Sequence, residues 1–479
     1  MIIHNNSADA PTISSPDEQR KILRQLRSEI LLRYRPHIQE GPGPIRVMAR
    51  LVAELEQECR RRNIAEEIIA SEIVNRTIGD VNLRKVIECE GEPGGPADYR
   101  LLADDLGIAL PGEDLHGYIA SGEAYLWLRE QMMECERLLL AHDYDPRIYD
   151  IYGVGNPVLR SWLAEEMWGL PVRGEQVYLS LGAMDGIDKV LRGLAHMYRE
   201  QNISDPAVLF PEPGFGVPEW QAKSCGYRLH RFSTLPEHHF KLTATQLDQI
   251  LAQNTDIRLI YLTITNNPTA FAYNPTELNA LHDVLRRYWQ QGRNILTFAD
   301  LAYIGTGNPQ EDQERVEAFT PSDVLAHTIF ISSFSKTHSL TGERFGWVTC
   351  GNPALASAIA PSWSNTMASL PGEWQLRFMA YLLLIQSRPW IVEKIRAFYR
   401  LRRERLVAQL RRIDEEQHLF AQIYRDDDAT VYNWSRLRPE EDAFSLFEKT
   451  GIAGVPGSGF GYTDEFIRFS IGVIPVPTV

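Results

Sequence analysis

The sequence predicts an α/β protein whose large domain has three αβα layers around a mostly parallel sheet. After about residue 150, short β-rich runs alternate with helical segments. This alternation is typical of parallel strands joined by crossover helices. Residues whose side chains can bind ligands or take part in catalysis also follow several of these runs directly. They stand at the end of the strand where such sheets form binding sites.

Six β-rich, largely apolar runs are the expected strands of this sheet: 176–181, 207–210, 258–264, 294–299, 328–333 and 345–350. Helices are expected between several of them, including 183–198 and 275–289. Residues 372–416 read as long helices rich in Leu and Arg, and the tail that follows has short strands and a Gly-rich turn. The tail therefore predicts a second, smaller α+β unit.

The first part of the chain has a different pattern. From Pro16 to about Glu90, apolar residues recur at helical spacing, and a Gly/Pro break at 41–44 separates two helical runs. We expect four segments along the chain: a helical N-terminal extension at 1–110, an arm or pocket segment at 111–150, a large domain at 151–360 and a small C-terminal domain at 361–479.

Composition excludes several classes of function. A formal charge of −14 argues against nucleic acid or an anionic membrane as the main partner. The sequence contains no apolar stretch near the roughly 20 residues that span a bilayer, and its start lacks the features of a secretory signal, so we expect a cytoplasmic location. Five cysteines lie without CxxC spacing, which predicts reduced thiols and no metal site.

Lys336 is the most informative residue. It stands between small hydroxyl residues in Ser333-Phe-Ser-Lys-Thr337, after an apolar run. A lysine desolvated in a tight turn has a lowered pKa and becomes a nucleophile toward carbonyl compounds, which is Schiff-base chemistry. An ordinary loop lysine is the alternative interpretation of this segment alone.

Two polar residues follow other predicted strands. The carboxylate of Asp300 can pair with a protonated ring nitrogen of a cofactor, although an acid at this place can also cap a helix. Tyr303 lies three residues further on. The Asn267-Pro-Thr segment puts an amide within reach of a ring hydroxyl oxygen, but such a segment is also a common turn.

Anion-binding groups are the third feature. Gly182-Ala-Met184 joins a strand to a helix and leaves backbone N–H groups available to an anion. Arg344 follows Lys336 by eight residues, and Arg468 has apolar neighbours, where its guanidinium needs an anion or a structural salt bridge. Phe215 follows a strand on a turn, where it stacks on a flat cofactor or packs against the protein.

Taken in order, these segments resemble the class I/II aminotransferase group of fold-type I pyridoxal phosphate enzymes. The resemblance covers about residues 110–479. The matching pieces are Tyr152-Gly with Leu159-Arg160, Gly182-Ala-Met184, Pro213-Gly-Phe215, Asn267-Pro-Thr269, Asp300-Leu-Ala-Tyr303, Ser333-Phe-Ser-Lys336 through Arg344-Phe-Gly-Trp347, Pro456-Gly-Ser-Gly-Phe-Gly461 and Arg468-Phe-Ser470.

The resemblance implies a role for each of these residues. Lys336 would bind pyridoxal 5′-phosphate covalently and move the substrate Cα proton, and Asp300 would pair with the pyridine nitrogen. Arg468 would bind the substrate carboxylate, with Asn267 beside it. The remaining cofactor contacts would be Asn267 and Tyr303 to the ring oxygen, Phe215 on the ring face, and Gly182, Ala183, Met184, Ser333 and Arg344 at the phosphate, with Tyr152 from the second subunit of a homodimer.

The chain also departs from the family pattern. Ala270-Phe271 follows Asn267-Pro-Thr where the family usually has glycine, so we expect a different backbone path there. Gly122, in Ser121-Gly-Glu123, loosely resembles the loop that lines the family's substrate pocket. About 110 additional N-terminal residues precede the matching region.

Three functions remain open from the sequence. The leading one is an aminotransferase that acts on an L-amino acid. The second is an enzyme on the same fold that eliminates or replaces a β or γ substituent, or cyclises its substrate, in specialised metabolism. The third is a cofactor-binding sensor without turnover.

Overall fold

The computed structural model describes residues 15–38, 43–83, 86, 124–142, 144–150, 152–166, 168–424 and 430–472. The chain forms two compact units, both discontinuous in sequence. Unit 1 comprises residues 1–79, 410–424 and 434–470, and unit 2 comprises 80–409, 425–433 and 471–479. The four-segment division expected from the sequence stays a prediction.

Unit 2 is built on a seven-stranded sheet. Its strands, in spatial order, are β2 (Val177–Leu181), β8 (Phe345–Cys350), β7 (Thr328–Ser333), β6 (Leu296–Asp300), β5 (Ile257–Thr263), β3 (Ala207–Glu212) and β4 (Arg228–Ser233). Strands β7, β6, β5, β3 and β4 run parallel, whereas β8 is antiparallel to both of its neighbours. The predicted α/β class with a mostly parallel sheet is therefore confirmed.

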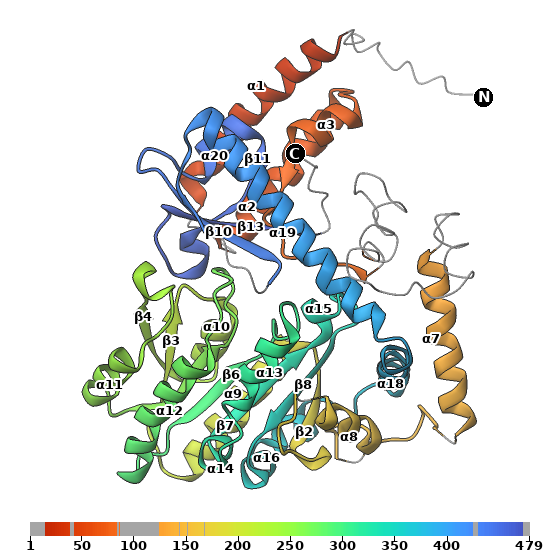
Figure 1. Ribbon diagram of the computed structural model, residues 1–479, viewed down its shortest axis with the longest axis vertical. Coiled ribbons are helices and arrows are strands. Elements are labelled where there is room, and N and C mark those ends of the chain that lie inside the picture. Colours follow the sequence, from red (N-terminus) through yellow and green to blue (C-terminus); the bar gives the residue numbers. More distant parts are fainter. Residues whose placement is uncertain are drawn as a thin grey trace, which may run out of the picture. The chain divides into compact units, whose positions relative to one another are not determined.

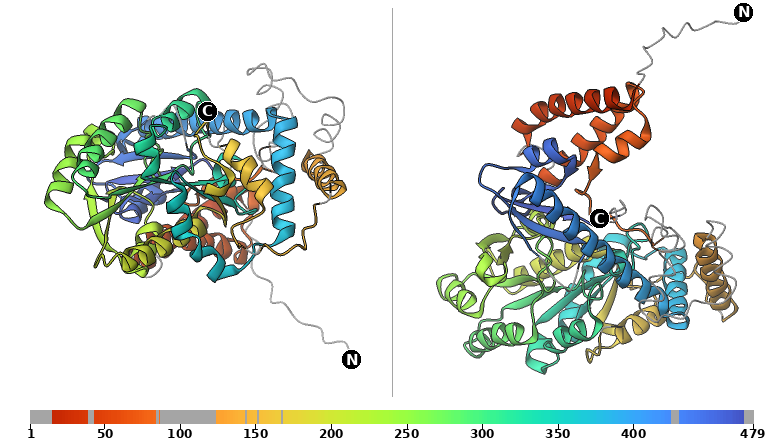
Figure 2. Two further views of the ribbon diagram at one scale, coloured as in Figure 1. Left: turned by 90° about the horizontal axis from the view of Figure 1, so that it is seen from below. Right: turned by 45° about the horizontal axis from the view of Figure 1, so that its top comes forward.

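Helices lie on both faces of this sheet (Figure 1; Figure 2). The main helices that join or flank its strands are α8 (Pro157–Glu165), α9 (Ala183–Glu200), α10 (Val217–Ser224), α11 (Ala244–Gln253), α12 (Pro275–Gln290), α13 (Pro309–Glu317), α14 (Ser322–Ala326), α16 (Pro353–Ile359) and α17 (Pro361–Met367). One face of the sheet forms a core with α9, α16 and α17, which includes Val190, Leu194, Ile329, Val348 and Trp363.

Unit 2 also includes helices α15 (Phe334–Thr337), α18 (Gly372–Ser387), α7 (Ala124–Ala141) and most of α19 (Trp390–Gln417). The short α15 follows β7, and α18 packs against α7. The long α19 belongs to unit 2 as far as Gln409 and contributes its last residues to unit 1.

Unit 1 combines N-terminal helices with C-terminal strands. Helices α1 (Pro16–Tyr34), α2 (Pro44–Arg61) and α3 (Glu66–Glu72) pack on one another, as the right-hand view of Figure 2 shows in red and orange. Helix α1 also contacts α20 (Ala443–Thr450). A four-stranded sheet has the order β12 (Val455–Pro456), β13 (Phe466–Ser470), β10 (Tyr432–Leu437) and β9 (Phe420–Ile423).

One expectation for the N-terminal region was wrong. The helical pattern expected to about residue 90 is interrupted after Glu72, where β1 (Val74–Asn75) forms a strand. The reason is tertiary, because β1 pairs in parallel with β11 (Ile452–Ala453) and its backbone groups bond to that strand instead of forming a helical turn. In the described part of the chain, no helix is long and apolar enough to cross a membrane.

Candidate active site

The strands of unit 2 bring the predicted site residues to one edge of the sheet. Parallel strands β3, β5, β6 and β7 are consecutive in the sheet, so their carboxyl ends lie at the same edge. Phe215, Asn267, Asp300 and Lys336 each stand at or just beyond one of these ends. The sheet therefore positions side chains that are far apart in the sequence along one short line.

The predicted anion-binding residues lie at the same edge of the seven-stranded sheet. Leu181, at the end of β2, pairs with Phe345 at the start of β8, and Ser333, at the end of β7, pairs with Gly346. Gly182 and Arg344 directly flank the first of these pairs. Pairing across β2, β8 and β7 thus places Gly182, Arg344 and Ser333 together.

Asp300 is the last residue of β6 and is buried, with 9% of its surface exposed. Its Oδ1 accepts a hydrogen bond from the Ala302 backbone N–H at 2.9 Å, and its Oδ2 accepts one from the Tyr261 hydroxyl. Burial raises the pKa of the Asp300 carboxyl, and both hydrogen bonds act against this rise because they favour the ionised form.

Lys336 lies in α15 and its side chain is half-buried. The turn that carries it is held at both ends. Ser333 caps the helix by accepting a hydrogen bond from the Ser335 N–H at 3.1 Å, and the Tyr399 hydroxyl donates to the Lys336 carbonyl at 2.7 Å. The backbone of Lys336 is therefore fixed at the end of a buried strand.

Gly182 and Arg344 form a compact cradle at the start of α9. Gly182 has a φ of +80°, and no side chain caps the first turn of the helix. Arg344 donates to the Leu181 carbonyl at 3.4 Å and to the Ser335 hydroxyl at 3.3 Å. Uncapped N–H groups beside a guanidinium favour an anion at this helix terminus.

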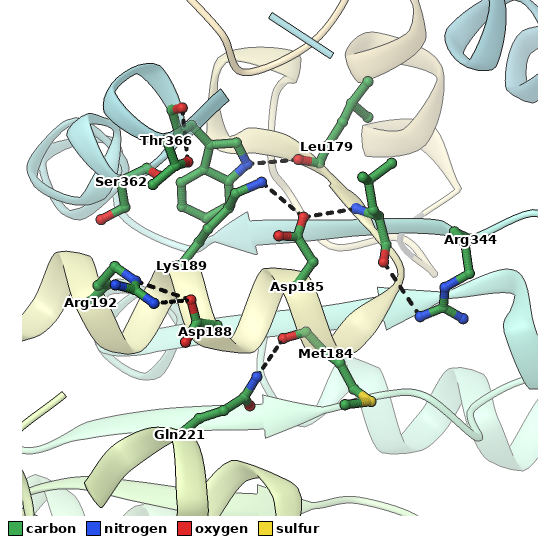
Figure 3. Close-up of polar contacts among 12 residues, drawn as sticks. Leu179, Met184, Asp185, Asp188, Lys189, Arg192, Gln221, Arg344, Ser362 and Thr366 are labelled. Atoms are coloured by element: carbon green, nitrogen blue, oxygen red, sulfur yellow. Dashed lines mark hydrogen bonds and ion pairs between the residues drawn. The ribbon is translucent and has the colours of Figure 1, made fainter. Parts of the chain in front are cut away.

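A partly buried ion pair supports the first turns of α9. Lys189 Nζ lies 2.8 Å from Asp185 Oδ2, and the same carboxylate oxygen accepts a hydrogen bond from the Leu181 N–H at 2.9 Å (Figure 3). Lys189 is almost completely buried and lies over the Trp363 ring. The pair neutralises an acidic charge close to the anion cradle and fixes the turn from β2 into α9.

The loops that follow β3 and β5 are joined to each other. The Asn266 side-chain amide donates to the Pro213 carbonyl at 3.0 Å, which ties the Asn267 loop to the turn that carries Phe215. Asn267 is buried and Phe215 is half-buried. Tyr303, in the loop after β6, donates from its hydroxyl to the Tyr432 hydroxyl at 3.3 Å.

Ala270 takes the place where the family usually has glycine, and its φ is +66°. This is the left-handed region, which glycine adopts without strain and alanine adopts at a cost. The loop therefore accommodates the alanine in a glycine-like conformation.

Arg468, Tyr152 and Gly122 complete the set of predicted site residues. Arg468 is in β13 of unit 1, where its Nη2 donates to the Thr77 carbonyl at 2.7 Å and its guanidinium lies over the Phe460 ring. Tyr152 is 70% exposed on unit 2. Gly122 lies outside the described residues.

Comparison with known proteins decides the family. The profile of the family described as "Aminotransferase class I and II" matches residues 159–475. The chain belongs to this family. Its members use pyridoxal 5′-phosphate, so this class I/II aminotransferase homologue is a pyridoxal phosphate-dependent transferase.

Curated relatives of this aminotransferase homologue carry aminotransferase names. "Putative aminotransferase YugH" of Bacillus subtilis is 25% identical over 301 residues, which are 62% of this chain and 71% of that protein. An LL-diaminopimelate aminotransferase of Dehalococcoides mccartyi is 25% identical over 67% of this chain and 78% of its own length. The match to an asparagine–oxo-acid transaminase of Streptococcus mutans, 28% identical, covers 50% of this chain and 58% of that protein, less than two thirds of its length.

Solved structures show the same fold. Aspartate aminotransferase from Thermus thermophilus with maleate has a TM-score of 0.62 at 20% identity, over 92% of this chain and 94% of that one. Aspartate aminotransferase from Rhizobium meliloti has a TM-score of 0.64 at 16% identity, over 90% and 92% of the two chains.

The residues at the sheet edge fit pyridoxal phosphate. The α9 terminus with Arg344 suits a phosphate, because a Cβ on Gly182 would lie 2.2 Å from Arg344 Nη2 and only a glycine leaves this cradle open. Asp300 has a buried carboxylate suited to a ring nitrogen, and each of its oxygens can accept a further hydrogen bond beside those from Ala302 and Tyr261. Lys336 carries a primary amine at the same edge.

Two residues of this edge were not predicted from the sequence. Tyr261 reaches Asp300 from the neighbouring strand, and Ser335 lies between Ser333 and Arg344. Ser335 could have been found from the sequence, since its hydroxyl stands next to Lys336 in the same motif. Tyr261 could not, because its contact with Asp300 depends on strand register.

Proposed function

We propose that this protein transfers the amino group of an L-amino acid to a 2-oxo acid, with Lys336 as the residue that binds the cofactor and moves the substrate proton. The observation that carries the proposal is the alignment of Lys336 and buried Asp300 at the ends of adjacent parallel strands, β7 and β6. When bound, pyridoxal phosphate supplies a ring that draws electrons from the bond broken at the substrate Cα.

The residues at this edge would hold the cofactor as follows. Asp300 would pair with the ring nitrogen, Asn267 and Tyr303 would bond the ring oxygen, and Phe215 would contact the ring. Arg344 would bind the phosphate, together with Gly182, Ala183, Met184 and Ser333. The uncapped first turn of α9 and the adjacent guanidinium support this assignment.

Arg468 binds the substrate carboxylate through both of its terminal nitrogens. Arg468 is 3% exposed, and a guanidinium shielded from water attracts a carboxylate more strongly than one in open solvent. A fixed carboxylate directs the Cα–H bond toward the base that removes its proton. Gly122 and Asn267 are the further substrate contacts that we propose.

Lys336 acts as the base. Its amino group would hold pyridoxal phosphate and would also take up the proton at the substrate Cα. The hydrogen bond from Tyr399 to the Lys336 carbonyl supports this role, because it keeps the backbone in place while the side chain changes partner.

We further propose a homodimer in the cytoplasm, with Tyr152 reaching the phosphate of the second subunit. Large exposed apolar side chains around Tyr152 support the proposal that a second subunit covers this surface. Ile148, Tyr149 and Tyr152 are 61–71% exposed, and the Asp150 N–H bonds to Ser369 Oγ, which brings exposed Met367 to the same region. The four described cysteines are free thiols, as a reducing compartment requires.

A donor screen tests the proposed reaction. Purified holoprotein is mixed with each L-amino acid and a 2-oxo acid acceptor, and both products are measured. Stoichiometric formation of a new amino acid and a new oxo acid supports transamination. Release of ammonia or of a substituent from Cβ or Cγ, without consumption of the acceptor, would instead support elimination or replacement.

A further inference from the structure

We infer that Tyr261 is a positioning residue that keeps Asp300 ionised and thereby keeps the cofactor ring nitrogen protonated. This inference rests on the proposed role of Asp300. Among the described residues, Tyr261 supplies a side-chain hydroxyl to this carboxylate, which also accepts the Ala302 backbone N–H.

Strand register brings the two side chains together. Thr263 of β5 pairs with Asp300 of β6, and Tyr261 pairs with Phe298. Because side chains alternate along a strand, Tyr261 and Asp300 lie on the same face as diagonal neighbours, a distance that a tyrosine spans. The hydroxyl of Tyr261 donates to Asp300 Oδ2.

Neighbouring rings hold Tyr261 in this orientation. Its ring lies between Phe210 and Phe298, with a centroid distance of 5.5 Å to each. Tyr261 is 5% exposed, and burial together with the charge of Asp300 raises the pKa of its hydroxyl well above the ordinary value. Tyr261 therefore remains a neutral donor throughout the pH range in which enzymes work.

The consequence concerns the charge of Asp300. Burial alone favours the protonated carboxyl, which would leave no anion to pair with a protonated ring nitrogen. A hydrogen bond to an ionised group is worth about 10- to 150-fold in an equilibrium constant. Removing the Tyr261 hydroxyl should shift the proton from the ring nitrogen toward Asp300 by a factor of this order.

Matched controls exist in the same core. Tyr198 and Tyr227 belong to the hydrophobic cluster that contains Tyr261, and their hydroxyls donate to the backbone carbonyls of Arg258 and Leu191 at 3.3 and 2.9 Å. Tyr198→Phe and Tyr227→Phe therefore remove a buried hydroxyl without touching Asp300. If the loss of any buried tyrosine hydroxyl disturbed the core enough to move the cofactor signal, these two control variants would show the same change.

The test is the ¹⁵N NMR signal of the ring nitrogen in holoprotein reconstituted with ring-¹⁵N-labelled pyridoxal phosphate. We expect the position of a protonated nitrogen in wild type, Tyr198→Phe and Tyr227→Phe, and a movement toward the neutral position in Tyr261→Phe and Asp300→Asn. If the ¹⁵N signal moves in Asp300→Asn but stays in place in Tyr261→Phe, the inference about Tyr261 is overturned and the proposed role of Asp300 stands. An unmoved signal in Asp300→Asn would overturn the proposed role of Asp300 itself.

A binding measurement tests the same inference for any variant whose NMR spectrum is too poor to interpret. Apoprotein is titrated with pyridoxal phosphate and with its analogue that has carbon in place of the ring nitrogen. We expect the preference for the natural cofactor to fall about tenfold or more in Tyr261→Phe, as one charged hydrogen bond predicts, and to stay unchanged in Tyr198→Phe. Equal preference in wild type and Tyr261→Phe contradicts the inference.

Discussion

Gly182 and Arg344 lie so close that a methyl group on Gly182 would be 2.2 Å from Arg344 Nη2. Residues 162 positions apart in the sequence thus share one small space, because β2 pairs with β8 next to both of them. The contact explains why the turn into α9 has a glycine at a φ of +80°. It also makes Gly182 the position where the addition of one methyl group should affect cofactor binding.

Gly182→Ala should weaken cofactor binding and the fold together. The Gly182 backbone, at φ +80° and ψ 170°, lies in a region that costs alanine about 1–3 kcal/mol, and the methyl group displaces the Arg344 guanidinium. If one charged hydrogen bond to the phosphate is lost, the cofactor dissociation constant rises about tenfold or more. Gly342→Ala is the control, since an added Cβ there meets nothing within 4 Å. Equal cofactor affinity in the two variants would refute the cradle.

Lys189→Met should destabilise the protein by about 2–3 kcal/mol, somewhat less than the loss of one partner of a fully buried pair. Lys189 is buried, but the Asp185 side chain is 31% exposed, so solvent partly compensates the carboxylate that remains. Asp185→Asn added to Lys189→Met should recover more than half of the loss. Urea denaturation of the apoprotein measures both variants.

Arg192 provides the control for this pair. It forms an ion pair with Asp188 one turn further along α9, and its side chain is 58% exposed (Figure 3). Arg192→Met should change the free energy of unfolding by at most about 1 kcal/mol, as for other surface pairs. A similar loss in Arg192→Met and Lys189→Met would show that burial of the Asp185–Lys189 pair has no particular effect.

Glu212 predicts a pH dependence of stability. Burial, helped by the charge of Glu219 and opposed by Arg231, raises the pKa of its carboxyl to about 7 from an ordinary value of 4.5. The folded state therefore binds more protons than the unfolded state between these two pKa values. The contribution of Glu212 to stability is fully present below 4.5 and is lost as the pH rises through about 7.

Glu212→Gln should remove this part of the pH dependence. Denaturation midpoints measured from about pH 5 to about pH 8 should fall less steeply in the variant than in wild type. Glu165→Gln, which changes an exposed carboxylate, should leave the wild-type slope unchanged. Parallel slopes in wild type and Glu212→Gln would contradict the raised pKa.

Arg468→Ala should reduce affinity for an amino acid by about 2–5 kcal/mol, as expected for a buried charge pair that loses one partner. The variant also loses the contacts with Thr77 and Phe460, so stability alone is uninformative. The informative measurement compares the amino acid with the corresponding amine, which has no carboxylate. The loss should be confined to the amino acid, whereas an equal loss for both compounds would indicate a structural role.

Much of the sheet could be predicted because its central strands are buried on both faces and read as continuous apolar runs. Strand β4 was missed for the opposite reason. It lies at the sheet edge, and its residues, Arg228–Ser233, are exposed or half-buried and include two arginines and a histidine. Strands β1 and β11 have two residues each and exist only through their pairing, which leaves no periodic signal.

The candidate site shows the same division. Lys336, Asp300 and Asn267 could be identified because a motif places each of them after a strand. The contact of Tyr261 with Asp300 depends on the register of β5 against β6, and the approach of Gly182 to Arg344 depends on the pairing of β2 with β8. Single-sequence patterns contain neither register nor long-range pairing, so these relationships required the structure.

A single-turnover experiment on Lys336 is the decisive test of the proposed transamination. Holoprotein is mixed with the best donor amino acid and no oxo-acid acceptor, and released oxo acid is counted per active site. Wild type should release one oxo acid per site and stop with the cofactor in its amine form, whereas Lys336→Ala should release none at a comparable rate. Continued turnover to another product in wild type, or normal release by Lys336→Ala, would contradict the assignment of this protein as an aminotransferase that works through Lys336.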